Sequence, residues 1–262
     1  MHSSLQRYFA LRIKNLFNYL HDFELTGAET PLHDFRVELK KLKSIIKFLK
    51  TIYSKDKFKK TSFLLNTVFL QAGEIREYQL LLQWLNGHQL TQLAQTYFPE
   101  EKMKRMIDRF HQQASSYESD LKEVIERCSK FIHTTNKILP EQYIIELNAK
   151  IEKRLHKRSI SDDWHELRKI IKQWIYATNW IAEEEETNRG SQFSLYNKLQ
   201  ESIGHWHDLQ VIKETIAQKQ IHLSAEIDIQ KDLSKAMDKL NHAIRYRENH
   251  ITEMIAKTLA VA

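Results

Sequence analysis

The hydrophobic pattern of residues 32–50 predicts an amphipathic helix. Steps of four, three, four and three residues separate the large apolar positions of this stretch: Phe35, Leu39, Leu42, Ile46 and Leu49. This spacing gathers them on one side of an α-helix, the side that packs against a core. Pro31 stands just before the pattern, where proline suits the first turn of a helix.

A second stripe on the same predicted helix is basic. Its members follow one another at steps of three or four residues: His33, Arg36, Lys40, Lys43, Lys47 and Lys50. Like charges at this spacing destabilise a helix by about 0.2–0.5 kcal/mol per pair. The acids Asp34 and Glu38 are expected in the first two turns, where the helix dipole favours them. Such a row of cations indicates a long negative ligand; the alternative is a solvated lysine face that only aids solubility.

The scarcity of helix-breaking residues predicts long helices in the rest of the chain. Five glycines and three prolines occur in 262 residues, whereas these two residue types usually make up about 12% of a protein. Alternating β-branched runs, which would predict strands, do not occur in the sequence. Apolar periodicity and the few turn signals predict an all-α fold with helices over 4–23, 31–53, 55–85, 88–97, 100–134, 140–157, 161–185, 191–218 and 225–256.

The histidine-bearing stretch occurs twice in the sequence. Residues 32–36 (Leu-His-Asp-Phe-Arg) match residues 164–168 (Trp-His-Glu-Leu-Arg), 132 positions later. Both copies continue to a lysine at the next turn, Lys40 in the first and Lys172 in the second. A repeat over this distance indicates two related halves of the fold.

A pair of mid-helix glycines repeats at nearly the same separation. Gly73 and Gly204 are 131 positions apart, each inside a predicted helix, where glycine costs about 1 kcal/mol relative to alanine. Another element is therefore expected to approach the backbone closely at both positions. The sequence predicts two four-helix bundles, residues 1–137 and 138–262, related by a pseudo-two-fold axis around a basic central groove.

Composition narrows the class of protein. Apolar residues make up 42% and charged residues 28% of the chain, and the formal net charge is +6. No apolar run approaches the roughly 20 residues of a membrane span, and the first 20 residues read as an amphipathic helix and not a signal peptide. The single cysteine, Cys128, excludes an intrachain disulfide and a zinc site built from cysteines. These features predict a cytoplasmic protein that does not associate with membranes.

Taken together, the two copies resemble the CHAD domain (conserved histidine α-helical domain), over nearly the whole chain. The resemblance rests on His33, Arg36, Lys40, Lys43 and Lys47 in the first copy, and on His165, Arg168, Lys169 and Lys172 in the second. Gly73-x-x-Arg76-Glu77 and Gly204-x-x-His207-Asp208 support it. The family implies an all-α fold of two four-helix bundles with a basic cavity that binds inorganic polyphosphate.

The resemblance also implies which residues bind the ligand. They are the nine basic residues named above for the two copies, together with Arg76, which either adds a contact or pairs with a carboxylate of its own bundle. Family members occur alone or fused to a triphosphate-tunnel domain, and the Glu-x-Glu-x-Lys element of such a tunnel is absent from this sequence. The chain is therefore expected to be a stand-alone module.

The second copy departs from the family pattern because it is poorer in bases. After Lys172 come Gln173, Trp174, Ile175 and Tyr176. The preceding helix offers bases that could substitute: Lys153, Arg154, Lys157 and Arg158. His207 occupies a position that is usually arginine or asparagine. The second half is therefore expected to hold a polyanion less firmly than the first.

The expected function is non-catalytic binding of inorganic polyphosphate, without a cofactor. Lysine acts on phosphate as a point charge, and arginine can donate two hydrogen bonds to it. A bound polyanion would favour the charged form of His33 and His165, so binding should strengthen as the pH falls. The acidic run 183–186 is interpreted as a solvated helix end, the alternative being a lid that competes for the basic groove.

Two other functions remain open from the sequence. Nucleic acid also binds basic grooves, but single-strand readers need exposed aromatic platforms, and the aromatic residues here fall mostly on apolar faces expected in the core: Phe35, Phe48, Trp174, Trp180 and Trp206. A phosphate-releasing enzyme would need a metal or acid–base group. His205 and His207 are two apart on a helix and point in different directions, which argues against a metal site.

Overall fold

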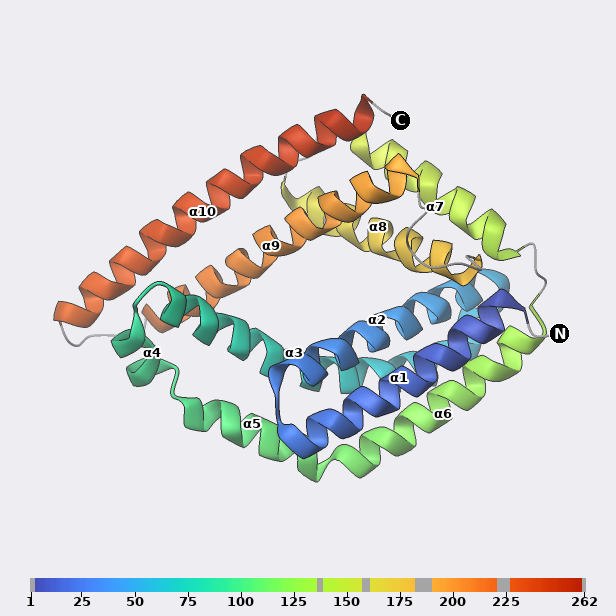
Figure 1. Cartoon of the computed structure of the whole chain (residues 1–262), viewed down its shortest axis with the longest axis horizontal. Coiled ribbons are helices and arrows are strands. Elements are labelled where there is room, and N and C mark those ends of the chain that lie inside the picture. The colour runs from blue at the N-terminus through green and yellow to red at the C-terminus, as the bar shows by residue number, and fades with distance from the viewer. Residues whose placement is uncertain (1–2, 136–138, 157–160, 182–189, 221–226, 261–262) are drawn as a thin grey trace. The chain divides into compact units, whose positions relative to one another are not determined.

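The fold of the chain was analysed in a computed structural model. The structure describes residues 3–135, 139–156, 161–181, 190–220 and 227–260 (Figure 1). Throughout these ranges all regular secondary structure is helical, which confirms the predicted all-α class. No helix among them combines the length and the apolar character needed to cross a membrane.

Most helices lie close to their predicted positions. In chain order they are α1 (Ser4–Thr26), α2 (Glu29–Ile52), the 3-10 turn η1 (Lys55–Phe58), α3 (Lys59–Gly87), α4 (Thr91–Tyr97), α5 (Glu100–Gln112), α6 (Ala114–His133), α7 (Leu139–Leu155), α8 (Ser161–Ile181), α9 (Ser191–Gln220) and α10 (Ile227–Leu259). The connection from α1 to α2 is tight because Gly27 adopts a left-handed conformation, with φ of 61°, which glycine reaches without steric cost.

The prediction of one continuous helix over 100–134 was wrong. The chain breaks at Gln113 between α5 and α6, where the Gln113 amide donates to the Phe110 carbonyl, three residues back, at 3.1 Å. The break lies beside buried aromatic packing: the Phe110 ring lies 5.4 Å from Phe23 and 4.9 Å from Tyr117. Neither glycine nor proline marks this point, so tertiary packing overrides a continuous helical pattern.

The chain divides into two compact units, each assembled from three segments. Unit 1 comprises Met1–Arg76, Lys104–Leu147 and Tyr176–Glu185. Unit 2 comprises Glu77–Met103, Asn148–Ile175 and Glu186–Ala262. These boundaries differ from those of the sequence repeats 1–137 and 138–262. The repeats and the pseudo-two-fold relation between them therefore stay predictions.

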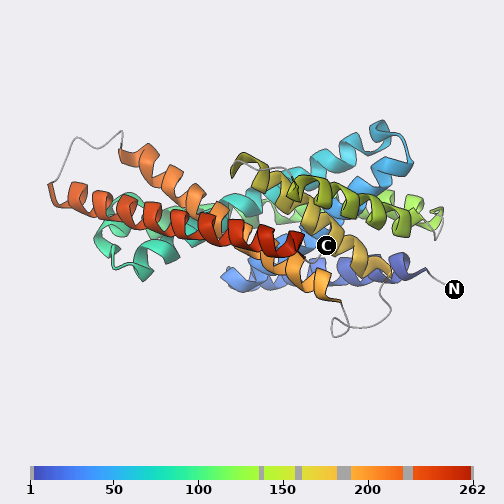
Figure 2. The ribbon, with the colours of Figure 1, turned by 90° about the horizontal axis from the view of Figure 1, so that it is seen from above.

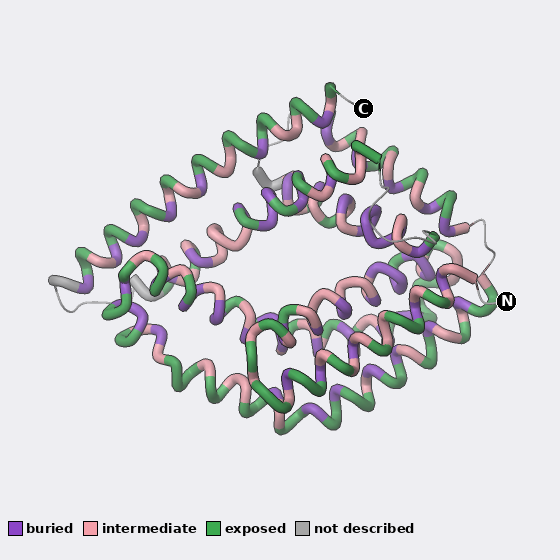
Figure 3. Tube along the Cα trace, in the orientation of Figure 1, coloured by how far each residue is buried: buried purple, intermediate pink, exposed green. Residues whose placement is uncertain are grey.

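The core of unit 1 is formed by apolar sides of α1, α2 and α6. α1 packs along α2, and α6 contacts both helices (Figures 1 and 2). Buried positions recur at intervals along each helix, separated by exposed ones (Figure 3). Phe35 and Phe48 on α2 are fully buried, as predicted, and the Phe48 ring lies 5.2 Å from that of Trp180.

The core of unit 2 contains three buried tryptophans, Trp164, Trp174 and Trp206. α9 packs along α10, which also contacts α4 (Figures 1 and 2). Trp164 and Trp206 meet edge to face, with ring centroids 5.3 Å apart. Trp206 also donates from Nε1 to the carboxylate of Glu248 at 3.2 Å. Trp174 packs on Tyr196 at 5.1 Å, and both Trp174 and Trp206 are buried in the core as expected.

A buried carboxylate joins α1 to α2 in unit 1. Only 3% of the Glu38 side chain is exposed, and its Oε1 accepts hydrogen bonds from Arg12 at 3.2 Å and from Lys41 at 2.9 Å. Because α2 begins at Glu29, Glu38 lies in the third turn. The sequence-based explanation through the helix dipole was therefore wrong for Glu38. The residue serves instead as the ion-pair partner of two cations.

We expect Glu38→Ala to lower the free energy of unfolding by about 2 kcal/mol, because it leaves two partly buried cations without their acceptor. Chemical denaturation followed by circular dichroism would measure the change. The matched control is Glu123→Ala, which removes an exposed pair with Lys60 and should cost less than about 0.5 kcal/mol. Equal effects of the two substitutions would contradict a structural role for Glu38.

Candidate functional site

Arg36 packs its guanidinium against the backbone of α3 at Gly73. A Cβ at position 73 would lie 2.6 Å from Nη1 of Arg36, closer than such atoms approach one another. The same Nη1 donates to the Phe69 carbonyl at 3.3 Å, one helical turn before Gly73. The glycine therefore provides the space in which the arginine of the His-x-x-Arg pattern lies. This contact explains the first of the two mid-helix glycines.

The basic stripe from His33 to Lys50 lies on α2, and we call it the α2 stripe. Three of its cations lie close to the side chain of Phe69 on α3. Its ring centroid lies 4.7 Å from Cζ of Arg36, 4.1 Å from Nζ of Lys43 and 6.0 Å from Nζ of Lys40. These distances are in the range of attraction between a cation and an aromatic face. We call this group of four residues the Phe69 cluster. It unites three of the predicted site residues with an aromatic side chain that the sequence analysis did not identify.

The ends of the α2 stripe have different surroundings. Lys47 is exposed, one turn beyond Lys43. Near the start of the helix, Arg76 forms an ion pair with Glu29 in the first turn of α2. Of the two roles considered for Arg76, the structure thus shows pairing with a carboxylate of its own unit.

His33 lies on the exposed side of α2, as the fifth residue of the helix. Partial desolvation and then the positive charges of Arg76 and Lys40 lower the pKa of His33. The imidazole therefore favours its neutral form in the absence of a ligand. An anion bound nearby would reverse this preference.

Unit 2 repeats the contact between arginine and glycine. Nη2 of Arg168 lies 2.9 Å from the position that a Cβ of Gly204 would occupy, and Nε lies 3.1 Å from it. Nε donates to the Gln200 carbonyl at 3.2 Å, again one turn before the glycine. The two copies therefore share the same local packing of α2 on α3 and of α8 on α9.

The side chain one turn before the glycine differs between the copies. Gln200 stands where the first copy has Phe69, and its Oε1 accepts a hydrogen bond from Lys172 at 3.5 Å. Lys169, another predicted contact, pairs with Glu166 at 2.7 Å, and both side chains are about half exposed. In the second copy the partners of the cations are the oxygens of Gln200 and the carboxylate of Glu166. In the first copy the cations also contact the aromatic ring of Phe69.

Two histidines face each other in unit 2. The rings of His165 and His207 lie 4.8 Å apart. Desolvation, followed by the charges of Lys169 and His207, lowers the pKa of His165. Desolvation also lowers the pKa of His207, opposed by Asp208 and assisted by Arg168. Both imidazoles thus favour the neutral form without a ligand, as His33 does.

The alternative bases proposed for the second half are only partly described. Lys153 is exposed, and Arg154 pairs with Asp163 at 3.1 Å. Lys157, Arg158 and the acidic run 183–186 lie outside the described residues. Within the described ranges no three His, Cys, Asp or Glu side chains come together in a way that could hold a metal ion.

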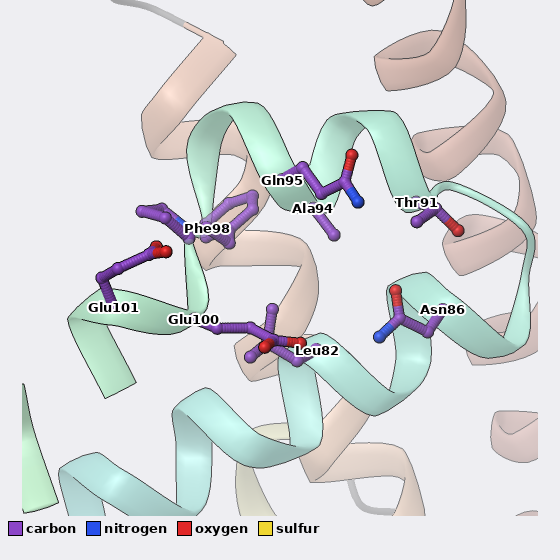
Figure 4. A pocket seen from close by; sticks show the side chains of 9 residues that line it. Leu82, Asn86, Thr91, Ala94, Gln95, Phe98, Glu100 and Glu101 are labelled. Atoms are coloured by element: carbon purple, nitrogen blue, oxygen red, sulfur yellow. The ribbon is translucent and has the colours of Figure 1, made fainter. Parts of the chain in front are cut away.

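Unit 2 also contains a pocket of about 410 Å³, whose lining differs in charge from the basic clusters. It is formed where the end of α3, α4 and the start of α5 meet, and Glu100 and Glu101 line it beside Asn86 and Gln95 (Figure 4). Among the described residues that line it there is no lysine, arginine or histidine. Its carboxylates do not suit an anionic ligand.

One sequence signal could have identified Phe69. Positions 69 and 200 both lie four residues before the repeated glycines, so the offset of 131 pairs them. A phenylalanine that pairs with glutamine across a repeat is poorly explained as a core position. The sequence does not reveal that three cations of α2 lie around the Phe69 ring, because this contact depends on how α2 and α3 are rotated relative to one another.

Comparisons with known proteins bear on the family and the fold of the chain. The family model of the CHAD domain matches residues 20–217. The crystal structure of the CHAD domain from the plant Ricinus communis is similar in fold, with a TM-score of 0.74 and 15% sequence identity, over 100% of this chain and 93% of that chain. No curated protein matches the chain. Because the family model covers more than half of its residues, the chain belongs to the CHAD domain family.

Proposed function

We propose that this protein binds inorganic polyphosphate along the basic side of α2, without chemical conversion of the ligand. The observation that carries the proposal is the Phe69 cluster, in which Arg36, Lys40 and Lys43 come together on one aromatic ring. Lys47 continues the stripe by one turn. From Arg36 to Lys47 the stripe extends about 16 Å at 1.5 Å per residue, long enough to contact several phosphates of one chain.

The chemistry of the stripe suits a featureless polyanion. Ammonium groups act as point charges, and the guanidinium can donate paired hydrogen bonds to phosphate oxygens. Polyphosphate has no bases or sugars to distinguish, so binding requires only cations at suitable spacing. Membership of the CHAD family supports the same ligand.

The second copy contributes less in this proposal. Arg168 and Lys172 both donate to Gln200, and Lys169 already has a carboxylate partner. A phosphate that binds Lys169 must compete with Glu166. His165 and His207 can add positive charge only when an anion raises their pKa values.

The most direct prediction concerns the two central lysines. Lys40→Glu combined with Lys43→Glu should weaken the binding of long-chain polyphosphate by about a hundredfold, because two charge-assisted contacts are lost and replaced by repulsion. Isothermal titration calorimetry would measure the affinity. The slope of log affinity against log salt should also become shallower, since fewer phosphate charges are neutralised.

Lys169→Glu is the matched control, because Lys169 is about half exposed and already paired. It should weaken binding by less than the Lys40 and Lys43 pair does. A single-stranded oligonucleotide should displace polyphosphate poorly. Unchanged binding after reversal of Lys40 and Lys43 would show that the α2 stripe is not the site.

Gly73 on α3 provides a second prediction, in which a substitution changes stability little but weakens binding. In Gly73→Ala the new Cβ displaces the flexible end of Arg36, while the helix gains up to about 1 kcal/mol of propensity. The free energy of unfolding should therefore change by less than about 1 kcal/mol, whereas polyphosphate affinity should fall about fivefold through loss of one ordered contact. A variant with unchanged affinity would contradict a binding role for Arg36 in this position.

Binding should depend on pH through His33, His165 and His207. Their pKa values lie below the usual 6.5, so the free folded protein binds fewer protons than the unfolded chain, and acidification through this range destabilises it. A bound polyanion raises these pKa values. Polyphosphate affinity at constant ionic strength should therefore be higher at about pH 5.5 than at about pH 8; equal affinities would exclude the histidines from binding.

A further inference from the structure

Phe69 is a partly buried aromatic residue that lies beside three basic side chains. The ring belongs to α3, whereas the three cations around it belong to α2, at positions 36, 40 and 43. Three cations within about 6 Å of one ring is a dense arrangement, since attractive pairs of this kind occur roughly once per 70–80 residues. The residue is only partly buried, so filling the core does not by itself account for its position.

We infer that Phe69 is a positioning residue, which holds Arg36, Lys40 and Lys43 together for an anion and thereby sets the affinity of unit 1 for polyphosphate. This inference rests on the proposed function. It assigns to an uncharged side chain a role in binding a highly charged ligand. No contact between Phe69 and the ligand is required.

The physical basis is the cost of holding like charges together. Cations one helical turn apart repel one another, and ordering a flexible lysine for binding has a cost in side-chain entropy. The negative face of an aromatic ring attracts each cation. The ring thus offsets part of both costs before the ligand arrives.

An aromatic ring has an advantage over a carboxylate at this position. A carboxylate would also hold the cations, but its charge would repel the incoming phosphate. The ring carries no net charge, so it stabilises the cluster without opposing the anion. The second copy illustrates the carboxylate case at a nearby position, where Glu166 pairs with Lys169.

The test uses the full chain and long-chain inorganic polyphosphate, with affinity measured by calorimetry at fixed salt and pH. Phe69→Leu removes the ring but keeps an apolar side chain. A series with mono-, di- and trifluorinated phenylalanine at position 69 keeps the shape of the ring and progressively weakens its negative face. The matched control is Phe63→Leu on the same helix, where the side chain is 69% exposed.

We expect Phe69→Leu to weaken binding about fivefold, the equivalent of one cation–aromatic attraction of about 1 kcal/mol. Affinity should fall stepwise along the fluorinated series, and Phe63→Leu should bind like the unsubstituted protein. Thermal unfolding without ligand checks that each variant is folded. If Phe69→Leu fails to fold, the fluorinated series still tests whether the ring of Phe69 affects polyphosphate affinity.

Two negative results have different meanings. If the unsubstituted protein binds polyphosphate and the trifluorinated variant binds equally well, Phe69 has no positioning role while the proposed function stands. If the unsubstituted protein does not bind polyphosphate at all, the proposed function fails, and this inference fails with it.

Discussion

The packing of an arginine guanidinium on a mid-helix glycine is the contact on which the candidate site depends. It occurs in both copies, between Arg36 and Gly73 and between Arg168 and Gly204. In each case the guanidinium also donates to a carbonyl one turn before the glycine. A Cβ at either glycine would occupy the place of the guanidinium. The cost of glycine within a helix is therefore offset by a fixed position for the arginine.

This contact determines how the basic stripe of α2 is presented in unit 1. With Arg36 fixed on α3, the next two turns of α2 bring Lys40 and Lys43 over the ring of Phe69. The apolar side of α2 is buried at the same time, and Glu38 joins the helix to α1 through Arg12. Core packing, an ion pair and the arginine–glycine contact thus all fix the rotation of one helix. A rigid row of cations loses less entropy on binding than a mobile one.

Much of this arrangement follows from the sequence, and the exceptions have physical reasons. The helices, the buried aromatics and a close approach at Gly73 and Gly204 could be predicted, because each depends on local spacing. The break at Gln113 could not, since it follows from packing around Phe110 and not from a breaker residue. Phe69 was missed because its role depends on which side of α3 faces α2. The second copy is predicted to bind a polyanion less firmly than the first. The replacement of Phe69 by Gln200 at the matching position is a structural difference that fits this prediction.

The central claim, that polyphosphate binds to the α2 stripe, is tested most directly by nuclear magnetic resonance of the charged side chains. Signals of the Arg36 guanidinium and of the Lys40 and Lys43 ammonium groups would be followed while polyphosphate is added. Lys122 and Lys130, which pair with carboxylates on the exposed surface of α6, serve as internal references. If polyphosphate binds to the α2 stripe, the signals of these α2 side chains shift first and saturate together, while the reference signals stay unchanged. Shifts of equal size at all lysines, or shifts that bypass α2, would contradict it.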